Sequence, residues 1–255
     1  MRKLLKVVCV TTLCVSLCFV GITVLLKGTA DTAQTQKKKL LSQPDRVSSG
    51  YPGARKHSIE KSIASAVRVV STDAEENGTS LATGTYFIYK GRYYVLTVAH
   101  AIAGPCEKFF IMYFEHSASC IDYVLVDTRR DYAIIETEEM YDRVPIRIPH
   151  SLKSKKYPKL LDQTYYTGYP NNSGPLTFTG TVAGFAEDSL ILLQSYAWTG
   201  SSGSGVFDYE GNLIGIIMAL DVGVTQHGVD VMENLLIVVP TSEIDWPTAL
   251  HHTGN

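Results

Sequence analysis

Short apolar runs rich in β-branched and aromatic residues follow one another from about residue 61 onward, with turn residues between them. Runs of this length and composition predict strands, and their even spacing is typical of an all-β domain. The dipeptide Lys90-Gly91 between two such runs predicts a tight hairpin. Periodicity alone leaves a sandwich and a barrel as alternatives. The predicted strands cover residues 64–70, 84–89, 93–98, 109–114, 123–126, 133–136, 163–167, 176–182, 189–194, 206–207, 213–218 and 235–239.

The pattern of apolar and polar residues changes on both sides of the predicted strands. After residue 239, Pro240-Thr241-Ser242-Glu243 favours a helix start, which predicts a short closing helix over 244–250. Residues 28–57 are polar, contain prolines and glycines, and show no sustained apolar period, so we predict a flexible linker. The linker carries the run Lys37-Lys38-Lys39, for which solvation is favoured over contact with anionic lipid.

Residues 7–26 form an uncharged, largely apolar segment that follows three basic residues near the N-terminus. About 20 apolar residues suffice for a helix to span a bilayer, whereas a cleavable signal has an apolar core of about 7 to 15. We therefore predict that residues 1–27 form a hydrophobic helix that anchors an extracytoplasmic catalytic domain to the membrane. Gly28-Thr29-Ala30 suits a signal peptidase, so a cleaved signal peptide and a secreted protein stay the alternative.

Length and composition limit the number of domains and the classes of binding partner. The 255 residues accommodate one domain of roughly 200 residues plus an appendage, which we place at 58–250. The 23 basic and 25 acidic residues nearly balance, so no nucleic-acid partner is expected. No group of histidines and cysteines has zinc spacing, and we expect neither a metal nor another cofactor. The sequence leaves the oligomeric state open.

The segment Gly200-Ser201-Ser202-Gly203-Ser204-Gly205 is the strongest candidate for chemistry. Its three glycines keep a backbone turn open and let main-chain N–H groups gather around one hydroxyl. Ser202 completes a Gly-x-Ser-Gly pattern and is the candidate nucleophile, with Ser201 and Ser204 as weaker competitors. A serine hydroxyl needs a base that removes its proton, and the base needs an orienting carboxylate.

Both partners can be found upstream. His100 ends the apolar run 93–100 and is the candidate base. Asp131 stands just before the apolar run 132–135, where it would be held rigidly beside an imidazole. Asp122 and Asp127 compete for this role, but neither directly precedes an apolar strand. The chain order His, Asp, Ser differs from the orders in α/β-hydrolases and subtilisins.

With these residues the chain resembles the trypsin-like (chymotrypsin-fold) serine peptidases, closest to the HtrA-type and glutamyl-endopeptidase-like bacterial branch. The resemblance covers roughly residues 60–245. It rests on Thr97-Val98-Ala99-His100, Asp131-Tyr132-Ala133-Ile134-Ile135, Gly168-Tyr169-Pro170, the Gly200 to Gly205 segment, and Gly211-Asn212-Leu213-Ile214-Gly215-Ile216. It implies two six-stranded antiparallel β-barrels with a short C-terminal helix. Because only about 15 residues follow Val239, we expect no peptide-binding module of the PDZ type.

The resemblance also implies a reaction. The expected activity is that of a serine endopeptidase, which hydrolyses a polypeptide through an acyl-enzyme on Ser202, with the N–H groups of Gly200 and Ser202 as oxyanion hole. The alternative is a catalytically silent, peptide-binding relative. Trypsin-type zymogens carry an acidic residue at the position of Ser201, so activation by N-terminal cleavage is not expected here.

Counting along the family motif predicts an uncharged substrate pocket. A pocket without charged side chains predicts cleavage after small or medium aliphatic residues, because a charged residue would be buried there without a partner. The predicted walls are Tyr196, Ala197, Ile217, Met218, Ala219 and Leu220.

Five cysteines fall into two groups, of which three lie inside the apolar segment 7–26. The other two, Cys106 and Cys120, flank the predicted strand 109–114. In an oxidising compartment they would close a loop beside the His100 segment, and two free thiols are an equally weighted alternative.

Overall fold

The computed structural model describes residues 53–72, 78–148, 157–225 and 228–251. The predicted membrane anchor and nearly all of the predicted linker lie outside these residues. Within the described ranges, no helix combines the length and the apolar character needed to cross a membrane.

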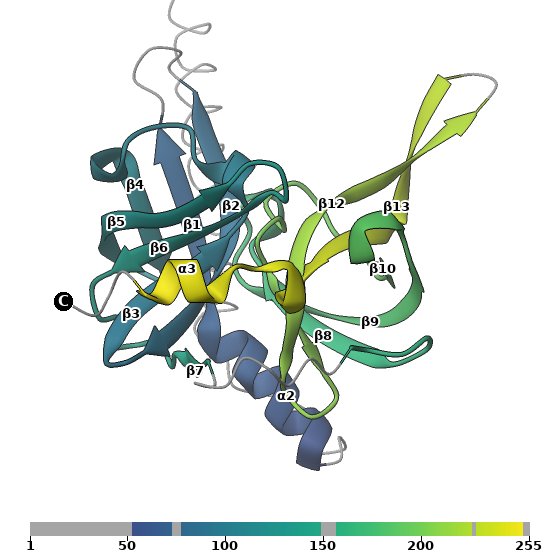
Figure 1. Ribbon diagram of the computed structural model, residues 1–255, viewed down its shortest axis with the longest axis horizontal. Coiled ribbons are helices and arrows are strands. Elements are labelled where there is room, and N and C mark those ends of the chain that lie inside the picture. The colour runs from purple at the N-terminus through teal and green to yellow at the C-terminus, as the bar shows by residue number, and fades with distance from the viewer. Residues whose placement is uncertain (1–52, 73–77, 149–156, 226–227, 252–255) are drawn as a thin grey trace, which may run out of the picture. The chain divides into compact units, whose positions relative to one another are not determined.

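Six antiparallel strands close the first barrel (Figure 1). Their order is β1-β4-β5-β6-β3-β2, and β2 pairs back onto β1. The two-residue strand β7 (Ile146–Arg147) adds a short parallel pairing to β2. The six strands are β1 (Ala66–Thr72), β2 (Thr79–Tyr89), β3 (Arg92–Thr97), β4 (Phe109–Tyr113), β5 (His116–Asp127) and β6 (Tyr132–Thr137).

The second barrel also has six antiparallel strands, in the closed order β10-β13-β12-β11-β8-β9. The predicted pair of six-stranded barrels is therefore confirmed. The strands are β8 (Gln163–Gly168), β9 (Leu176–Phe185), β10 (Ile191–Gln194), β11 (Gly205–Asp208), β12 (Leu213–Thr225) and β13 (Gly228–Pro240).

Aromatic side chains fill much of the first barrel, where Phe87 stacks on Tyr94 with ring centroids 5.1 Å apart. The second barrel encloses mainly aliphatic residues around Tyr166. Phe207, on β11, packs with the first barrel's core although its strand belongs to the second. Alternate faces of the second barrel's strands thus serve its own interior and the seam between the barrels, because successive strand residues point to opposite faces.

Helix α2 (Gly53–Ser65) precedes the first strand and was not predicted from the sequence. Its buried face consists largely of serines, which carry no apolar period: the Ser58 hydroxyl donates to the Asp208 carbonyl at 2.6 Å, and the Ser62 hydroxyl donates to Thr167 Oγ1 at 2.7 Å. Residues 53–57, assigned to the linker by their polarity, are therefore the first residues of this helix.

The short C-terminal helix is confirmed as α3 (Trp246–His251), which follows the 3₁₀ turn η5 (Thr241–Glu243). Trp246 packs edge-on against Phe87 with ring centroids 5.7 Å apart, so α3 covers the first barrel. The other 3₁₀ turns are η1 (Ala99–Ala101), η2 (Cys106–Lys108), η3 (Pro170–Asn172) and η4 (Glu187–Ser189).

Strands β12 and β13 are much longer than predicted. They pair from Gly215 opposite Pro240 to Thr225 opposite Gly228, and Figure 1 shows the two strands extending beyond the barrel. The predicted strands stopped at residue 218 and resumed at 235, because glycines, aspartates and a threonine interrupt the apolar runs between these points.

A disulfide joins Cys106 to Cys120, with their Cα atoms 5.4 Å apart. It links η2, which follows the His100 segment, to β5. Such a bond stabilises the fold mainly because it restricts the unfolded chain.

We expect the double variant Cys106→Ser/Cys120→Ser to lose about 2 to 4 kcal/mol in free energy of unfolding, since the closed loop of about 14 residues is opened in the unfolded state. Urea denaturation measures this. Reductant should shift the wild-type midpoint to that of the double variant and leave the variant itself unchanged. Identical midpoints for all four samples would contradict the prediction.

Candidate active site

Strand β3 ends at Thr97, and the turn η1 that follows it carries His100. Both carboxylate oxygens of Asp131 bind this histidine: Oδ2 lies 2.7 Å from Nδ1, and Oδ1 accepts the backbone N–H of His100 at 2.9 Å. The two contacts fix the imidazole's position and orientation. Its side chain remains 52% exposed, which leaves the ring open to a reactant.

Asp131 occupies the turn between β5 and β6 with φ of 57°, in the left-handed region that aspartate and asparagine tolerate better than most residues. The competing Asp127 is engaged in its own turn, where Oδ1 accepts the N–H groups of Arg129 and Arg130, both at 3.0 Å. Asp122 is exposed on β5. Of the three candidate carboxylates, Asp131 is the one that contacts His100.

The three serines of the glycine-rich turn differ in burial. Ser201 and Ser204 are buried, whereas Ser202 is partly exposed. The Ser204 hydroxyl donates to the Ser201 carbonyl at 2.6 Å, and the Ser201 hydroxyl accepts the N–H of Trp198 at 3.3 Å. Both buried hydroxyls thus serve the turn itself, and Ser202 is the serine accessible to a substrate.

Two glycines shape this turn with positive φ angles, +97° at Gly200 and +86° at Gly203. A Cβ atom on Gly203 would lie 2.0 Å from the Thr83 carbonyl oxygen, and one on Gly200 would lie 2.6 Å from the Tyr169 carbonyl oxygen. Any side chain at either position would displace backbone, so the turn requires glycine at both.

Thr83 on β2 connects the serine turn with the first barrel, and sequence reasoning did not identify it. Its N–H donates to the Ser202 carbonyl at 2.8 Å, and its hydroxyl donates to the Gly200 carbonyl at 2.7 Å. Its own carbonyl accepts the hydroxyl of Thr97 at 2.7 Å, three residues before His100. One fully buried threonine therefore ties the Ser202 turn to the strand that presents His100.

The Gly168-Tyr169-Pro170 motif lies against the same turn. The Tyr169 N–H donates to the Thr83 hydroxyl at 2.9 Å, and the Asn171 N–H donates to the Thr199 carbonyl at 2.6 Å. A Cβ on Gly168 would lie 2.4 Å from the Ser204 hydroxyl oxygen, which explains the small residue there.

Ser201, the residue before Ser202, makes hydrogen bonds with uncharged groups. The Tyr166 hydroxyl, inside the second barrel, donates to the Tyr196 carbonyl and is also hydrogen-bonded to the Ser201 side chain. Burial raises the pKa of Tyr166 above its usual range, so this hydroxyl stays protonated. Among the described residues, the contacts of the Ser201 side chain are therefore hydrogen bonds between uncharged groups.

The predicted pocket residues fall into two groups. Tyr196 is 71% exposed, and Met218, Ala219 and Leu220 are partly exposed on β12. Ala197 and Ile217 are instead buried in the hydrophobic cluster of the second barrel. The Gly203 N–H donates to the Ile217 carbonyl at 2.7 Å, which places the start of the exposed part of β12 beside the serine turn.

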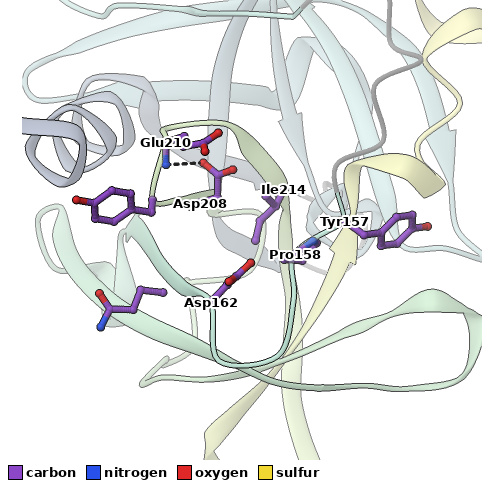
Figure 2. A pocket seen from close by; sticks show the side chains of 8 residues that line it. Tyr157, Pro158, Asp162, Asp208, Glu210 and Ile214 are labelled. Carbon is purple, nitrogen blue, oxygen red and sulfur yellow. Dashed lines mark hydrogen bonds between the residues drawn. The ribbon is translucent and has the colours of Figure 1, made fainter.

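A cavity of about 140 Å³ lies at the opposite end of β11 and is lined in part by Asp162, Asp208 and Glu210 (Figure 2). Asp208 uses its carboxylate within the β11–β12 turn, where Oδ1 accepts the N–H groups of Glu210 at 2.9 Å and Asn212 at 2.8 Å. Among the described residues, no cluster of three or more His, Cys, Asp or Glu could hold a metal ion.

The hydrogen bond to Asp131 raises the pKa of His100 above its ordinary value of 6.5; burial of the ring opposes this rise, and the charge of Asp131 adds to it. The sequence predicts His100 as a general base, which must be neutral to accept a proton, so we expect the predicted activity to fall as the pH drops through this raised pKa. We expect the acid limb of kcat/KM to have an apparent pKa above 6.5. A pH profile from about pH 5 to pH 9 measures it, and a limb centred at or below the ordinary value would contradict the assignment.

Two antiparallel six-stranded barrels, with a histidine–aspartate pair on one and a glycine-rich serine turn on the other, define the chymotrypsin-like class of fold. The family model of the trypsin-like peptidase domain matches residues 82–216, more than half of the chain. The protein therefore belongs to the trypsin-like peptidase family, as the motifs predicted. No curated protein is significantly similar to the chain by sequence.

Solved structures with the same fold include three proteases. A serine endoprotease from Yersinia pestis has a TM-score of 0.59 and 20% identity, with 75% of this chain and 64% of that one covered. The Rv3671c protease from M. tuberculosis, in its active form, has a TM-score of 0.58 and 15% identity, with 77% and 85% covered. The HtrA-type protease AlgW, solved with a tripeptide, has a TM-score of 0.57 and 19% identity, with 75% and 60% covered. The chain thus spans less than two thirds of two of these proteins.

Proposed function

We propose that this protein is a serine endopeptidase whose catalytic triad is Ser202, His100 and Asp131. The observation that carries the proposal is the double contact of Asp131 with His100, at 2.7 and 2.9 Å. The Thr83 contacts to the Ser202 turn and to Thr97 support it, because they connect the nucleophile's turn with the strand that leads to the base. Membership of the trypsin-like peptidase family adds independent support.

The reaction follows from these positions. As Ser202 Oγ attacks the peptide carbonyl, its proton passes to His100 Nε2, and Asp131 stabilises the imidazolium that forms. Collapse of the tetrahedral intermediate breaks the C–N bond, and the imidazolium protonates the leaving amine. Water, deprotonated by the same imidazole, then hydrolyses the ester on Ser202 and restores the free hydroxyl.

The negative oxygen of each intermediate needs fixed donors, and we assign this role to the N–H groups of Gly200 and Ser202. The positive φ of Gly200 supports the assignment, because it turns the peptide planes of this loop in a way that other residues rarely allow. Loss of one such donor in other enzymes costs about two to three powers of ten in turnover.

A fluorophosphonate probe tests the proposed function most directly, because it reacts with a serine that a neighbouring base has activated. Wild type should be labelled at Ser202, and His100→Ala should be labelled far more slowly while it stays folded. His116→Ala, which removes a histidine on β5 whose exposed side chain faces Asp142, is a matched control that should react like wild type. An unlabelled, folded wild type would favour the catalytically silent peptide-binding relative.

For specificity, we propose cleavage after small or medium aliphatic residues, with Met218, Ala219 and Leu220 beside the residue that precedes the scissile bond. No charged side chain lies among the predicted pocket residues to pair with a buried ion. An unpaired charge would cost several kcal/mol, whereas one methylene changes binding by about 1 to 3 kcal/mol. Exclusion of charge should therefore be strong and the ranking among aliphatics weak.

Digestion of a peptide library by wild-type protein measures this preference. We expect cleavage after valine, alanine and leucine, with few cuts after charged residues. Predominant cleavage after arginine, lysine or glutamate would overturn the pocket assignment and leave the triad assignment intact.

A further inference from the structure

Arg68 is a partly exposed residue of β1 and stands between Val67 and Val69, which belong to the core of the first barrel. In the register of β1 and β2 it pairs with Thr83, so the two side chains lie on the same face of the sheet. Thr83 contacts the serine turn through its N–H and its hydroxyl. The Arg68 side chain therefore starts from the same surface of the first barrel as this threonine.

The Arg68 guanidinium contacts the segment 169–173, which contains the 3₁₀ turn η3. Its Nη2 donates to the carbonyl of Asn172 at 3.3 Å and to that of Ser173 at 3.1 Å. Its Cζ lies 5.1 Å from the centroid of the Tyr169 ring, which is within the range of a cation–π interaction. Three contacts thus join one side chain of the first barrel to a segment that is distant in the sequence.

The backbone of this segment depends on contacts with its surroundings. Asn171 and Asn172 have positive φ angles of 49° and 54°. Asparagine tolerates the left-handed region better than most residues, but two successive residues persist there only when neighbouring groups hold the chain. The Ser173 N–H donates to the Pro170 carbonyl at 2.8 Å within the segment, and Arg68 provides two hydrogen bonds from outside it.

One hydrogen bond of the segment 169–173 reaches the proposed oxyanion hole. The Asn171 N–H donates to the Thr199 carbonyl at 2.6 Å. The Thr199 carbonyl and the Gly200 N–H belong to one planar trans peptide, so they point in opposite directions. A hydrogen bond to this carbonyl therefore also fixes the direction of the Gly200 N–H, which points away from Asn171.

We propose that Arg68 is a positioning residue for the oxyanion hole. It holds the segment 169–173 in place, so that the Asn171 N–H fixes the peptide between Thr199 and Gly200. The inference rests on the proposed function, in which the Gly200 N–H stabilises the negative oxygen of each intermediate. A guanidinium suits this role, because one nitrogen reaches two carbonyls while its plane interacts with an aromatic ring.

Loss of the guanidinium should lower the fraction of molecules in which the Gly200 N–H points at the negative oxygen. Arg68→Met keeps an unbranched apolar side chain and removes the donors. We expect kcat to fall about tenfold, whereas outright removal of an oxyanion donor costs about two to three powers of ten. KM should stay within about twofold, because the substrate carries no charge on this oxygen before the reaction. Arg68→Lys retains one positive donor group and should recover part of the loss.

Two peptide inhibitors distinguish this role from a merely structural one. Both end in the residue after which wild type cleaves the peptide library, one as an aldehyde and the other as the corresponding alcohol. Ser202 Oγ adds to the aldehyde carbon, the carbonyl electron pair moves to the oxygen, and the serine proton passes to His100. The alcohol has no carbonyl and forms no such oxygen. Arg68→Met should weaken inhibition by the aldehyde about tenfold and inhibition by the alcohol less than about twofold.

Arg92→Met is the matched control. Arg92 is exposed on β3 and pairs with Glu136 at 3.3 Å, so kcat and both inhibition constants should stay within about twofold of wild type. Urea denaturation shows that each variant is folded under the assay conditions. Exhaustive labelling with the fluorophosphonate counts the reactive serines, so that kcat refers to active molecules only.

A folded Arg68→Met protein with the wild-type kcat would overturn the inference. Equal weakening of both inhibitors would overturn it too, since the whole substrate site would then be disturbed. If Arg68→Met does not fold, Arg68→Gln, whose side chain is shorter and uncharged, is measured in the same way, and a wild-type ratio of its two inhibition constants would overturn the inference. Failure of wild type to react with the fluorophosphonate would instead overturn the proposed function, so the two failures are distinguishable.

Discussion

Replacing Ser202 by alanine should lower kcat by about four to six powers of ten and leave the fold intact. The hydroxyl forms the covalent intermediate, so no neighbouring group replaces it, and the side chain is partly exposed, so its removal leaves no buried cavity. Peptide hydrolysis measures the loss, and near-UV circular dichroism reports on the fold.

Ser204→Ala is the matched control for this variant. Its buried hydroxyl donates to the Ser201 carbonyl at 2.6 Å, so we expect a loss of about 1 kcal/mol in stability, with labelling by the fluorophosphonate retained. Unchanged activity in Ser202→Ala would refute the nucleophile assignment. Transfer of the label to Ser201 or Ser204 would refute it as well.

The Asp131→Asn variant should lose about four powers of ten in kcat near neutral pH. An amide N–H₂ facing Nδ1 would favour the tautomer that carries its proton on Nε2, and this form cannot accept the Ser202 proton. Asparagine tolerates the φ of 57° at this position, so the turn should persist. The acid limb of the pH profile should also move to lower pH, because the hydrogen bond from the His100 ring to a carboxylate, and with it the negative charge, no longer raises the pKa of His100.

Asp127→Asn provides the comparison. Its carboxylate accepts N–H groups of its own turn at 3.0 Å, an interaction that an amide oxygen also makes, so kcat should stay within about twofold of wild type. Similar losses in Asp127→Asn and Asp131→Asn would point to a general effect of charge near the β5–β6 turn and would contradict a specific role for Asp131.

The strands were predictable wherever burial on one face left a visible alternation or a continuous apolar run, as in β3 and β6. Helix α2 escaped prediction because Ser58 and Ser62 bury hydroxyls that bond to the second barrel, which produces no apolar stripe. The outer part of β12 escaped because its Asp and Gly residues resemble a loop in a single sequence, although they alternate with valines along a paired strand.

The same distinction applies to the site. His100, Asp131 and Ser202 could be proposed because each stands in a short local pattern, at the end of a strand, before a strand, and among glycines. Thr83 has no such pattern. Its importance arises only when β2 meets the Gly200 and Ser202 carbonyls, more than a hundred residues away in the chain, so tertiary structure was needed to find it.

The uncharged contacts of Ser201 bear on how the proposed enzyme becomes competent. Its hydroxyl accepts the Trp198 N–H and meets the Tyr166 hydroxyl, and both contacts form as the second barrel folds. A zymogen of the trypsin type must wait until a cut releases an ammonium group for the carboxylate at this position. We therefore expect the proposed enzyme to become competent on folding, without a cleavage that creates a new N-terminus to pair at this position. Refolded wild-type protein should then react with a fluorophosphonate without any prior treatment by a second protease.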